Sequence, residues 1–383
     1  MIDKNNRIKI AFLTSSDPRD KRSWSGLHYF MFKALQKHCG NVFHLGPVKS
    51  ISLIGKCINK ASKISLKKQY NYEHSIILAK RYGKIFSSKI SRKFFNLIFA
   101  PGASTEIAFL DVKIPTIYLS DTTFALLNNY YPGYTNLLDI SVREGNLIEG
   151  LAIKKASLLL YPSEWAAESA IKDYQADKSK IHVIPFGANL DYIPPKEIIL
   201  EKKKSPGCRL LFLAVEWQRK GGDIAFETLL KLEDLGIQAE LIVCGCKPSG
   251  KIYHNRMTYM PFLDKNDERQ QKELYKLYLS SDFLLSPTRA ECLGNVFCEA
   301  SAFGLPVIST DTGGVGGVVR NGENGYLLPI SATGSDYAKV IYDIYRDDSR
   351  YYEMVKSSRK AFEERLNWDA WGIEVRKIIN KIL

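Results

Sequence analysis

The stretch around residues 283–309 constrains the fold most, because it contains one complete unit of strand, loop, helix and strand. The apolar run 283–285 (FLL) is typical of a buried parallel strand, and residues 305–308 (LPVI) predict the next one. A helix is the usual connection between two parallel strands. Similar alternations of strand and helix occur on both sides of this stretch, so we predict an α/β protein with parallel sheets.

The same stretch carries two carboxylates, Glu291 and Glu299, separated by seven residues. The backbone N–H groups of Leu293, Gly294 and Asn295 lie where the helix is predicted to begin, and such groups can bind a phosphate. Glu291 falls in the loop at the carboxyl end of the first strand, where ligands bind in open α/β sheets. Glu299 falls one turn inside the helix and could accept hydrogen bonds from a diol. The alternative is a solvated loop acid and an exposed helix residue, but the surrounding unit favours a nucleotide or sugar site.

The length and one polar segment predict two domains. A chain of 383 residues exceeds what one hydrophobic core usually serves. Residues 191–205 are polar, rich in Lys and contain two prolines, which is typical of a linker. We therefore predict an N-terminal domain of residues 1–190 and a C-terminal domain of residues 206–366.

Composition excludes several classes of protein. Apolar residues make up 45% and charged residues 25% of the chain, which is ordinary globular usage. The seven cysteines have no regular spacing, and Cys244 and Cys246 lie in a strand-like run where core packing is expected, so we predict a reduced, cytoplasmic compartment. The histidines show no metal-ligand spacing, and we expect no metal site. Residues 1–7 are polar and no apolar run approaches 18 residues, so we expect neither a secretory signal nor a membrane span.

The positive charge is concentrated in one segment, residues 49–93. It holds twelve Lys or Arg residues and one acid, Glu73, a local balance of +11 in a chain whose net charge is +13. Apolar residues alternate with these charges, as in helices with one apolar and one basic face. An anionic membrane surface, an anionic acceptor and an ordinary solvated face all remain open. A nucleic acid is not expected, because the segment has no recognisable DNA- or RNA-binding motif.

Two residues of the N-terminal half are candidates for a second part of the site. The strand predicted at residues 9–14 is followed by a loop that reaches Gly26 without a G-x-G-x-x-G pattern. Gly26 permits close approach of a phosphate or hydroxyl group, or simply starts a helix. The strand predicted at residues 116–119 is followed by Asp121, which could act as a base, orient an acceptor hydroxyl or cap the next helix.

Two adjacent basic residues are candidates in the C-terminal half. Arg219 and Lys220 follow the strand predicted at residues 209–215 and precede a helix, with Gly221 next to them. In this position they would meet a diphosphate with charge and helix dipole together. The alternative is a pair of surface cations.

Together, these features resemble the family-4 retaining glycosyltransferases of the GT-B fold. The resemblance rests on residues 219–221 (RKG), the E-x7-E segment, residues 304–308 (GLPVI) and residues 311–314 (DTGG), with weaker support from residues 161–165 and 181–187. It implies two Rossmann-like domains facing a central cleft. It also implies that residues 367–383 cross back to the N-terminal domain, with Asn367 and Trp368 at the crossing.

The family's functional residues map onto individual positions of this chain. By resemblance, Glu291 binds donor-sugar hydroxyls beside the reacting carbon, Glu299 holds the ribose, and Lys220 neutralises the leaving phosphate. The N–H groups of residues 293–295 meet the diphosphate and sugar, and Arg219 substitutes for an arginine that the family carries earlier, where this chain has residues 214–215 (AV). A glutamate that many members carry after the Gly-Gly turn is replaced here by residues 316–317 (GG).

The resemblance therefore implies a transferase that moves a sugar from a UDP- or GDP-sugar to a glycan or lipid-linked acceptor. Retention of anomeric configuration, independence of metal, and a role in surface polysaccharide or glycolipid synthesis at the inner face of a membrane are further expectations. A nucleotide-sugar epimerase on the same fold and a non-catalytic nucleotide-sugar-binding protein are the alternatives. The sequence leaves the nucleotide, the sugar and the linkage open.

Overall fold

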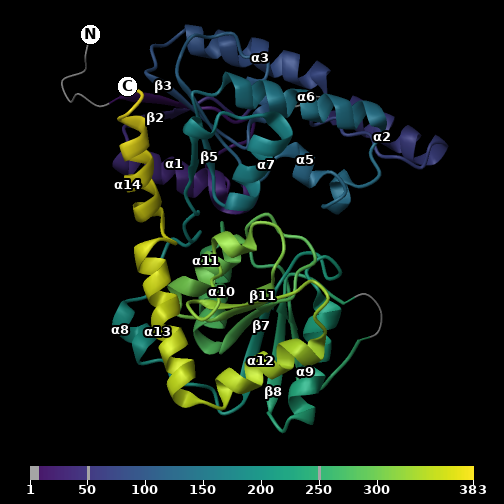
Figure 1. Cartoon of the computed structure of the whole chain (residues 1–383), viewed down its shortest axis with the longest axis vertical. Helices are drawn as coiled ribbons and strands as arrows, with labels where there is room; N and C mark the ends of the chain where they lie inside the picture. The colour runs from purple at the N-terminus through teal and green to yellow at the C-terminus, as the bar shows by residue number, and fades with distance from the viewer. Residues whose placement is uncertain (1–7, 50–51, 249–251) are drawn as a thin grey trace. The chain divides into compact units, whose positions relative to one another are not determined.

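The computed structural model describes residues 8–49, 52–248 and 252–383. The chain divides into two compact units: unit 1 comprises Met1–Ile184 and Gly372–Leu383, and unit 2 comprises Pro185–Trp371. Each unit is built on a six-stranded sheet in which all neighbouring strands are parallel (Figure 1). The predicted α/β class is confirmed.

The sheet of unit 1 has the strand order β2-β1-β3-β4-β5-β6. Its strands are β1 (Lys9–Phe12), β2 (Asn41–His44), β3 (Leu97–Pro101), β4 (Thr116–Leu119), β5 (Leu158–Tyr161) and β6 (Ile181–Val183). Its α-helices are α1 (Leu27–His38), α2 (Ser52–Ser65), α3 (Ile76–Ser91), α4 (Ser104–Ile107), α5 (Phe124–Leu127), α6 (Asp139–Lys155) and α7 (Glu164–Tyr174). The basic segment 49–93 thus forms two helices, α2 and α3; its residues 50 and 51, like residues 1–7, lie outside the described residues.

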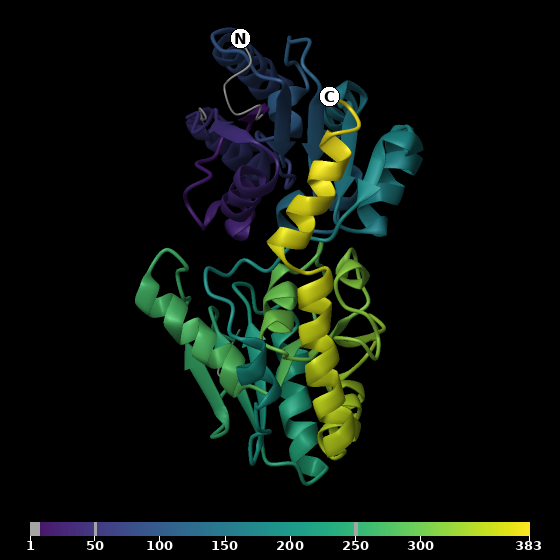
Figure 2. The same cartoon turned by 90° about the vertical axis from the view of Figure 1, so that its left-hand side faces the viewer.

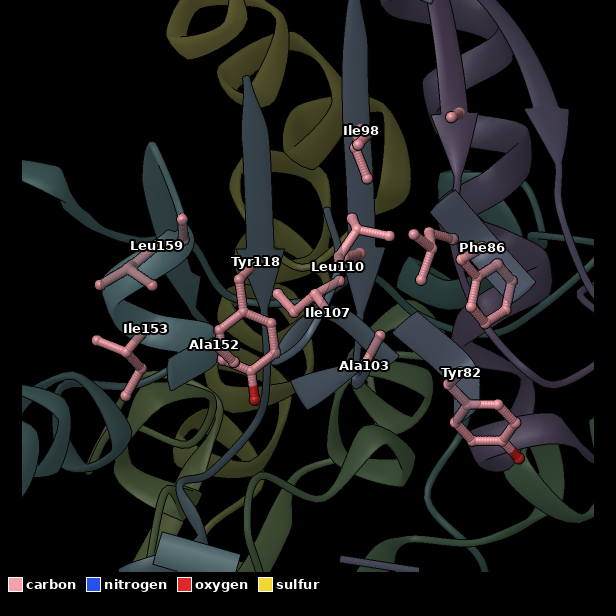
Figure 3. Close-up of a cluster of buried hydrophobic side chains, with 14 of the residues drawn as sticks. Tyr82, Phe86, Ile98, Ala103, Ile107, Leu110, Tyr118, Ala152, Ile153 and Leu159 are labelled. Carbon is pink, nitrogen blue, oxygen red and sulfur yellow. The ribbon is translucent and has the colours of Figure 1, made fainter. Parts of the chain in front are cut away.

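The core of unit 1 lies between the sheet and its covering helices. Strands β3, β4 and β5 contribute Ile98, Tyr118 and Leu159, which are fully or almost fully buried. Helices α3 and α6 contribute Phe86 and Ala152 to the same cluster (Figure 3). Because these strands are covered on both faces, they read as continuous apolar runs in the sequence.

The sheet of unit 2 has the strand order β12-β11-β10-β7-β8-β9. Its strands are β7 (Cys208–Leu213), β8 (Ala239–Cys244), β9 (Met257–Met260), β10 (Phe283–Ser286), β11 (Val307–Thr310) and β12 (Gly325–Leu328). Its α-helices are α8 (Lys196–Leu200), α9 (Gly222–Asp234), α10 (Glu268–Ser280), α11 (Asn295–Ala302), α12 (Gly334–Tyr345) and α13 (Asp348–Glu364). Helix α13 packs on α11 and α8 (Figure 2).

Both sheets contain a point where the strand order reverses. In unit 2 the chain runs outward through β7, β8 and β9, then returns to β10 beside β7 and continues the other way to β12. In unit 1 the reversal lies between β1 and β3. Ligands of open α/β sheets bind outside the carboxyl ends of the strands at such switch points. Ligands are therefore expected at the loops after β7 and β10, and at those after β1 and β3.

Most predicted elements are present, and the differences have local causes. Strand β4 has the predicted bounds. The C-terminal part of the chain forms three helices, α12, α13 and α14 (Trp368–Ile379). Asp347 caps α13 by accepting a hydrogen bond from the N–H of Arg350 at 3.1 Å. No helix in the described part of the chain is both long and apolar enough to cross a membrane.

The boundary between the units differs from the predicted linker. It falls between Ile184 and Pro185, whereas segment 191–205 contains α8 and belongs to unit 2. Ile199 on α8 is fully buried, which ties this segment to unit 2 despite its polar composition. At the other end, residues from Gly372 onward belong to unit 1, where the Sγ of Cys39 lies 3.7 Å from the carbonyl oxygen of Gly372.

Candidate active site

Two loops of unit 2 interlock at the switch point between β7 and β10. The N–H of Arg289 donates to the carbonyl of Arg219 at 2.8 Å, joining the loop after β10 to the loop after β7. Gly221 has a φ of +73°, and a Cβ added there would lie 1.9 Å from the carbonyl oxygen of Pro287. Only glycine fits this backbone approach. The two loops therefore hold each other at a fixed separation.

This interlock places two cations at Glu291. Both Glu291 and Lys220 are buried, and the Lys220 ammonium contacts Oε2 of Glu291. The guanidinium Nη1 of Arg219 lies 3.8 Å from the same oxygen and donates to the carbonyl of Ala290 at 2.9 Å. The structure thus brings together three of the predicted residues, one from the loop after β10 and two from the loop after β7. A buried carboxylate and ammonium in contact form a charged pair with little access to water.

The helix that follows Glu291 begins where the sequence predicts. Gly294 has a φ of +84° and caps α11, whose first residue is Asn295. Leu293 is buried just before it. The Nδ2 of Asn295 donates to the carbonyl of Gly187 at 3.3 Å, while its Oδ1 is buried and has no hydrogen-bond partner among the described residues. A helix N-terminus and an unused acceptor therefore lie next to the charged pair.

Glu299 is the second carboxylate of the motif, and it is almost completely buried rather than exposed. One of its oxygens contacts the Nζ of Lys265, and the other accepts a hydrogen bond from the hydroxyl of Tyr278 at 2.8 Å. The Tyr278 ring is stacked on Phe303, with centroids 5.0 Å apart. Both carboxylate oxygens are therefore held by donors from other elements, which fixes the plane of the carboxylate.

Sequence reasoning missed Lys265 and Tyr278. Lys265 lies in the loop that follows β9, at the same edge of the sheet as the loops after β7 and β10. Its position after a parallel strand was the available signal. Tyr278 lies on α10 and carried no signal, because its contact with Glu299 depends on how α10 and α11 pack.

In unit 1, the loop after β1 adopts an unusual backbone. Trp24, Ser25 and Gly26 have successive φ values of +47°, +54° and +91°. Left-handed backbone is disfavoured for residues that have a Cβ, and such conformations cluster at functional sites. The Cβ that Gly102 lacks would lie 3.2 Å from the Trp24 ring, so this loop also packs on the loop after β3. Gly26 thus lies at the switch point of unit 1.

Asp121 lies after β4, one strand away from that switch point. The expectation that it caps the next helix is wrong, because Thr123 does so: the Thr123 Oγ1 accepts a hydrogen bond from the N–H of Leu126 at 3.4 Å. Thr123 lies two residues after Asp121 in the same turn, and it caps the helix in place of Asp121. The suggested roles of Asp121 as a base or in orienting an acceptor stay predictions.

The switch point of unit 1 carries two titratable residues that the sequence did not single out. Glu106 is buried after β3, and its Oε1 accepts a hydrogen bond from the N–H of Ser15 after β1 at 3.2 Å. Burial raises the pKa of Glu106, while the hydrogen bonds from Ser15 oppose this rise. The His28 ring contacts the Oγ of Ser23 at 2.7 Å, and burial lowers the pKa of His28 to about 4, so the imidazole is neutral at pH 7.

The predicted site residues therefore form two groups. Unit 2 holds the larger group, whose members are Arg219, Lys220, Glu291, Leu293, Gly294, Asn295 and Glu299. Gly26 and Asp121 belong to unit 1. Within the described residues, no three His, Cys, Asp or Glu side chains gather as a metal site would require.

Solved structures with this architecture define the class. Sucrose-phosphate synthase from Thermosynechococcus elongatus superimposes with a TM-score of 0.68 at 16% identity, over 98% of this chain and 99% of that chain. HepE from Anabaena, solved in complex with UDP and glucose, superimposes with a TM-score of 0.61 at 17% identity, over 98% of this chain and 100% of that chain. Two Rossmann-like domains with parallel six-stranded sheets, shared with these proteins, are the GT-B fold of glycosyltransferases.

Sequence comparisons give the family. The family model of glycosyl transferases group 1 matches residues 201–361, which contain every predicted site residue of unit 2. Spore coat protein SA of Bacillus subtilis is 30% identical over 319 residues, which are 75% of this chain and 79% of that protein. A D-inositol 3-phosphate glycosyltransferase from Corynebacterium jeikeium is 24% identical over 70% of this chain and 67% of its own length. The chain belongs to the glycosyl transferases group 1 and is a glycosyltransferase.

Proposed function

We propose that the protein is a family-4 retaining glycosyltransferase that moves a sugar from a UDP- or GDP-sugar to a glycan or lipid-linked acceptor without a metal. One observation carries this proposal: the ammonium of Lys220 and the carboxylate of Glu291 are in contact at the switch point of unit 2, immediately before the N-terminus of α11. A site with one carboxylate, two cations and the N-terminus of a helix has the charges that a nucleotide sugar requires.

The chemistry follows from where charge develops during the reaction. When the bond between the sugar carbon and the phosphate oxygen breaks, the sugar becomes oxocarbenium-like and the diphosphate takes the electron pair. Lys220, Arg219 and the N-terminus of α11 provide preorganised positive charge for that diphosphate. Glu291 then accepts hydrogen bonds from donor-sugar hydroxyls, and the buried Oδ1 of Asn295 is a further acceptor beside it.

The nucleoside part of the donor would bind at Glu299. Each oxygen of this carboxylate already accepts from one donor, Lys265 or Tyr278, and each keeps a second lone-pair direction. Two oxygens fixed in one plane suit the two adjacent hydroxyls of a ribose. Lys265 and Tyr278 are positioning residues in this arrangement.

Several features support the choice of donor and location. HepE, which shares the fold, has been solved with UDP and with UDP-glucose, and this favours a UDP-sugar as the first donor to test. Another structure with the same fold is WaaG, a glycosyltransferase involved in lipopolysaccharide biosynthesis. A membrane-displayed acceptor, as in surface polysaccharide or glycolipid synthesis on the cytoplasmic side of a membrane, agrees with the positive charge of residues 49–93.

The donor is tested first by thermal shift with UDP- and GDP-sugars. A ligand present at 100 times its Kd adds about 2.7 kcal/mol to the free energy of unfolding, which is easily measured. The shift should disappear in Lys220→Met and persist in Lys231→Met, which changes an exposed lysine on the next helix. No shift with either class of donor contradicts the proposal.

Transfer is tested by incubating the protein and its donor with lipid-linked and soluble glycan acceptors, and with D-inositol 3-phosphate. Glu291→Gln should lose at least a hundredfold in turnover while donor binding persists, and the product should keep the donor's anomeric configuration by NMR. The rate should be the same with and without EDTA. Conversion of the donor without acceptor would indicate an epimerase, and binding without turnover a non-catalytic protein.

A further inference from the structure

Helix α2 differs from an ordinary surface helix, because small and polar residues lie on its buried face and large apolar residues are exposed. Among the residues whose burial the structure describes, those that it buries against the rest of unit 1 are small or polar: Gly55 and Ser62 are buried and Asn59 is half-buried. A Cβ at Gly55 would lie 2.3 Å from the Tyr72 ring, and the Oδ1 of Asn59 accepts a hydrogen bond from the N–H of Tyr70 at 3.0 Å. The helix is therefore docked on the rest of unit 1 through close packing at Gly55 and the hydrogen bond to Asn59.

Large apolar side chains of this helix are exposed instead. Leu53 is 75% exposed and Ile64 is 74% exposed, and Cys57 is exposed between them. At 3.6 residues per turn these three side chains lie within about 40° of one another around the helix axis. They lie along one side of the helix, opposite the docked residues, and we call these three residues the α2 stripe.

Lysines line one flank of the α2 stripe. Lys56, Lys60 and Lys63 are all exposed and recur every three or four residues, so they share one side of the helix. No Asp or Glu occurs between residue 49 and residue 72. Beyond the C-terminal end of the helix, Lys68 pairs with Asp139 at 2.8 Å, so the charge of Asp139 is already offset.

Helix α3, the other half of the basic segment, lacks this arrangement. Its apolar residues Leu78, Tyr82, Phe86 and Ile90 are buried in the core of unit 1, whereas Ile77 at its start is 72% exposed. The basic segment therefore contains one helix that buries a row of apolar residues in the core and one helix, α2, whose apolar stripe is exposed. Figure 1 shows α2 at the edge of unit 1, away from the chain's C-terminus.

We propose that the α2 stripe lies in the interface of an anionic phospholipid bilayer, with Lys56, Lys60 and Lys63 at the level of the headgroups. An apolar stripe beside a row of lysines is the pattern of helices that lie flat in a membrane surface. Each lysine near an anionic leaflet adds to the attraction. A second copy of this chain, which carries a net charge of +13, is repelled by the same lysines, and the cores of protein interfaces are depleted in lysine.

This inference rests on the membrane association within the proposed function and is independent of the donor chemistry. It is tested with the full chain and vesicles of phosphatidylcholine, with or without 30% phosphatidylglycerol, in the absence of donor. Binding should require phosphatidylglycerol and should weaken as salt is added. Replacement of Lys56, Lys60 and Lys63 by Ala should reduce binding at least tenfold.

The controls separate the stripe from general charge and hydrophobicity. The control for the lysine replacement changes three lysines that are exposed elsewhere to Ala, which gives the same change in net charge: Lys172, Lys276 and Lys377. The variant Leu53→Ser/Ile64→Ser should lose binding at least tenfold, whereas Ile330→Ser/Ile373→Ser, at residues 59% and 47% exposed, should keep it. The emission maximum of a fluorophore attached to Cys57 should shift to the blue with anionic vesicles only. The Cys57→Ser variant, treated with the same labelling reagent, should show no such shift.

Three results would overturn the inference: equal binding to both kinds of vesicle, binding that survives the Lys56/Lys60/Lys63 replacement, or self-association in solution that the stripe variants abolish. The last result would assign the stripe to a second copy of the chain. Transfer to a soluble acceptor should be unchanged in the stripe variants, so loss of membrane binding and failure of the proposed transferase activity are distinguishable.

Discussion

The Nζ of Lys220 contacts Oε2 of Glu291, although 71 positions separate the two residues in the sequence. The contact is possible because β7 and β10 are neighbours, so the loops that follow them meet at one edge of the sheet. It also couples the residue expected to meet the leaving diphosphate to the residue expected to meet the sugar. Changes at either residue should therefore affect the other.

This coupling predicts non-additive kinetics. Lys220→Met and Glu291→Gln should each lower kcat/KM at least a hundredfold, because each removes charge from the reacting centre. The double variant should be little worse than the more damaged single variant, because residues in contact act as one unit. Lys231→Met is the matched control and should leave kcat/KM unchanged. Losses that simply multiply in the double variant would show that the two residues act independently.

The interlocked loops predict a large effect at one glycine. Gly221→Ala should destabilise unit 2 by several kcal/mol, because its Cβ would lie 1.9 Å from a backbone carbonyl oxygen that must move. Gly236→Ala is the matched control: its φ is +78°, close to that of Gly221, but no atom lies within 4 Å of the added Cβ. It should cost about 1 to 2 kcal/mol for the left-handed backbone alone. Calorimetry measures the melting temperatures of both variants. An equal fall for Gly221→Ala and Gly236→Ala would mean that the two loops can separate.

The sequence predicts the local parts of this fold well. Apolar runs bounded by polar turns identify the strands, and the helix start at Asn295 follows from Gly294 and the preceding loop. It also identifies Lys220 and Glu291 separately, because each follows a strand. Their contact cannot be read from the sequence, since it depends on β10 returning to the side of β7. For the same reason, nothing local indicates that Lys265 lies against Glu299.

Tertiary packing also explains the other differences. The cap at Thr123 rather than Asp121 depends on which residue of the turn reaches the N–H of Leu126, and polar residues two positions apart are equally good candidates in the sequence. Segment 191–205 has the composition of a linker, yet Ile199 is buried on unit 2. One apolar side chain that packs on another element can therefore attach a segment to a unit even when its neighbours are mostly polar.

The Lys265 contact predicts a selective loss of donor affinity. Lys265→Met should raise the KM for the donor about tenfold with little change in kcat, because it alters ground-state and transition-state binding of the nucleoside equally. Tyr278→Phe should act in the same direction while keeping the ring stacked on Phe303. Lys276→Met, at an exposed lysine of α10, is the control. A fall in kcat at constant KM would place Lys265 in the chemical step instead.

A buried carboxylate in unit 1 predicts a dependence of stability on pH. Burial raises the pKa of Glu149 from 4.5 to about 7, although hydrogen bonds from Tyr118 and Ser104 oppose the rise. Because the folded-state pKa is higher than the unfolded one, the protonated form stabilises the fold, fully so below pH 4.5. This stabilisation is lost as the pH rises through 7. A shift of this size corresponds to on the order of 3 kcal/mol.

Glu149→Gln should therefore raise the melting temperature of unit 1 at pH 8 and leave it nearly unchanged at pH 4.5. The Gln amide oxygen can still accept the hydrogen bond that the Tyr118 hydroxyl donates to Oε1 of Glu149 at 2.9 Å. Glu168→Gln is the control, because Glu168 is exposed and its pKa is lowered by hydrogen bonding to Lys172. Melting curves of the three proteins between pH 4.5 and 8 give the answer. A difference between wild type and Glu149→Gln that does not change with pH would show that Glu149 keeps the same protonation state on unfolding.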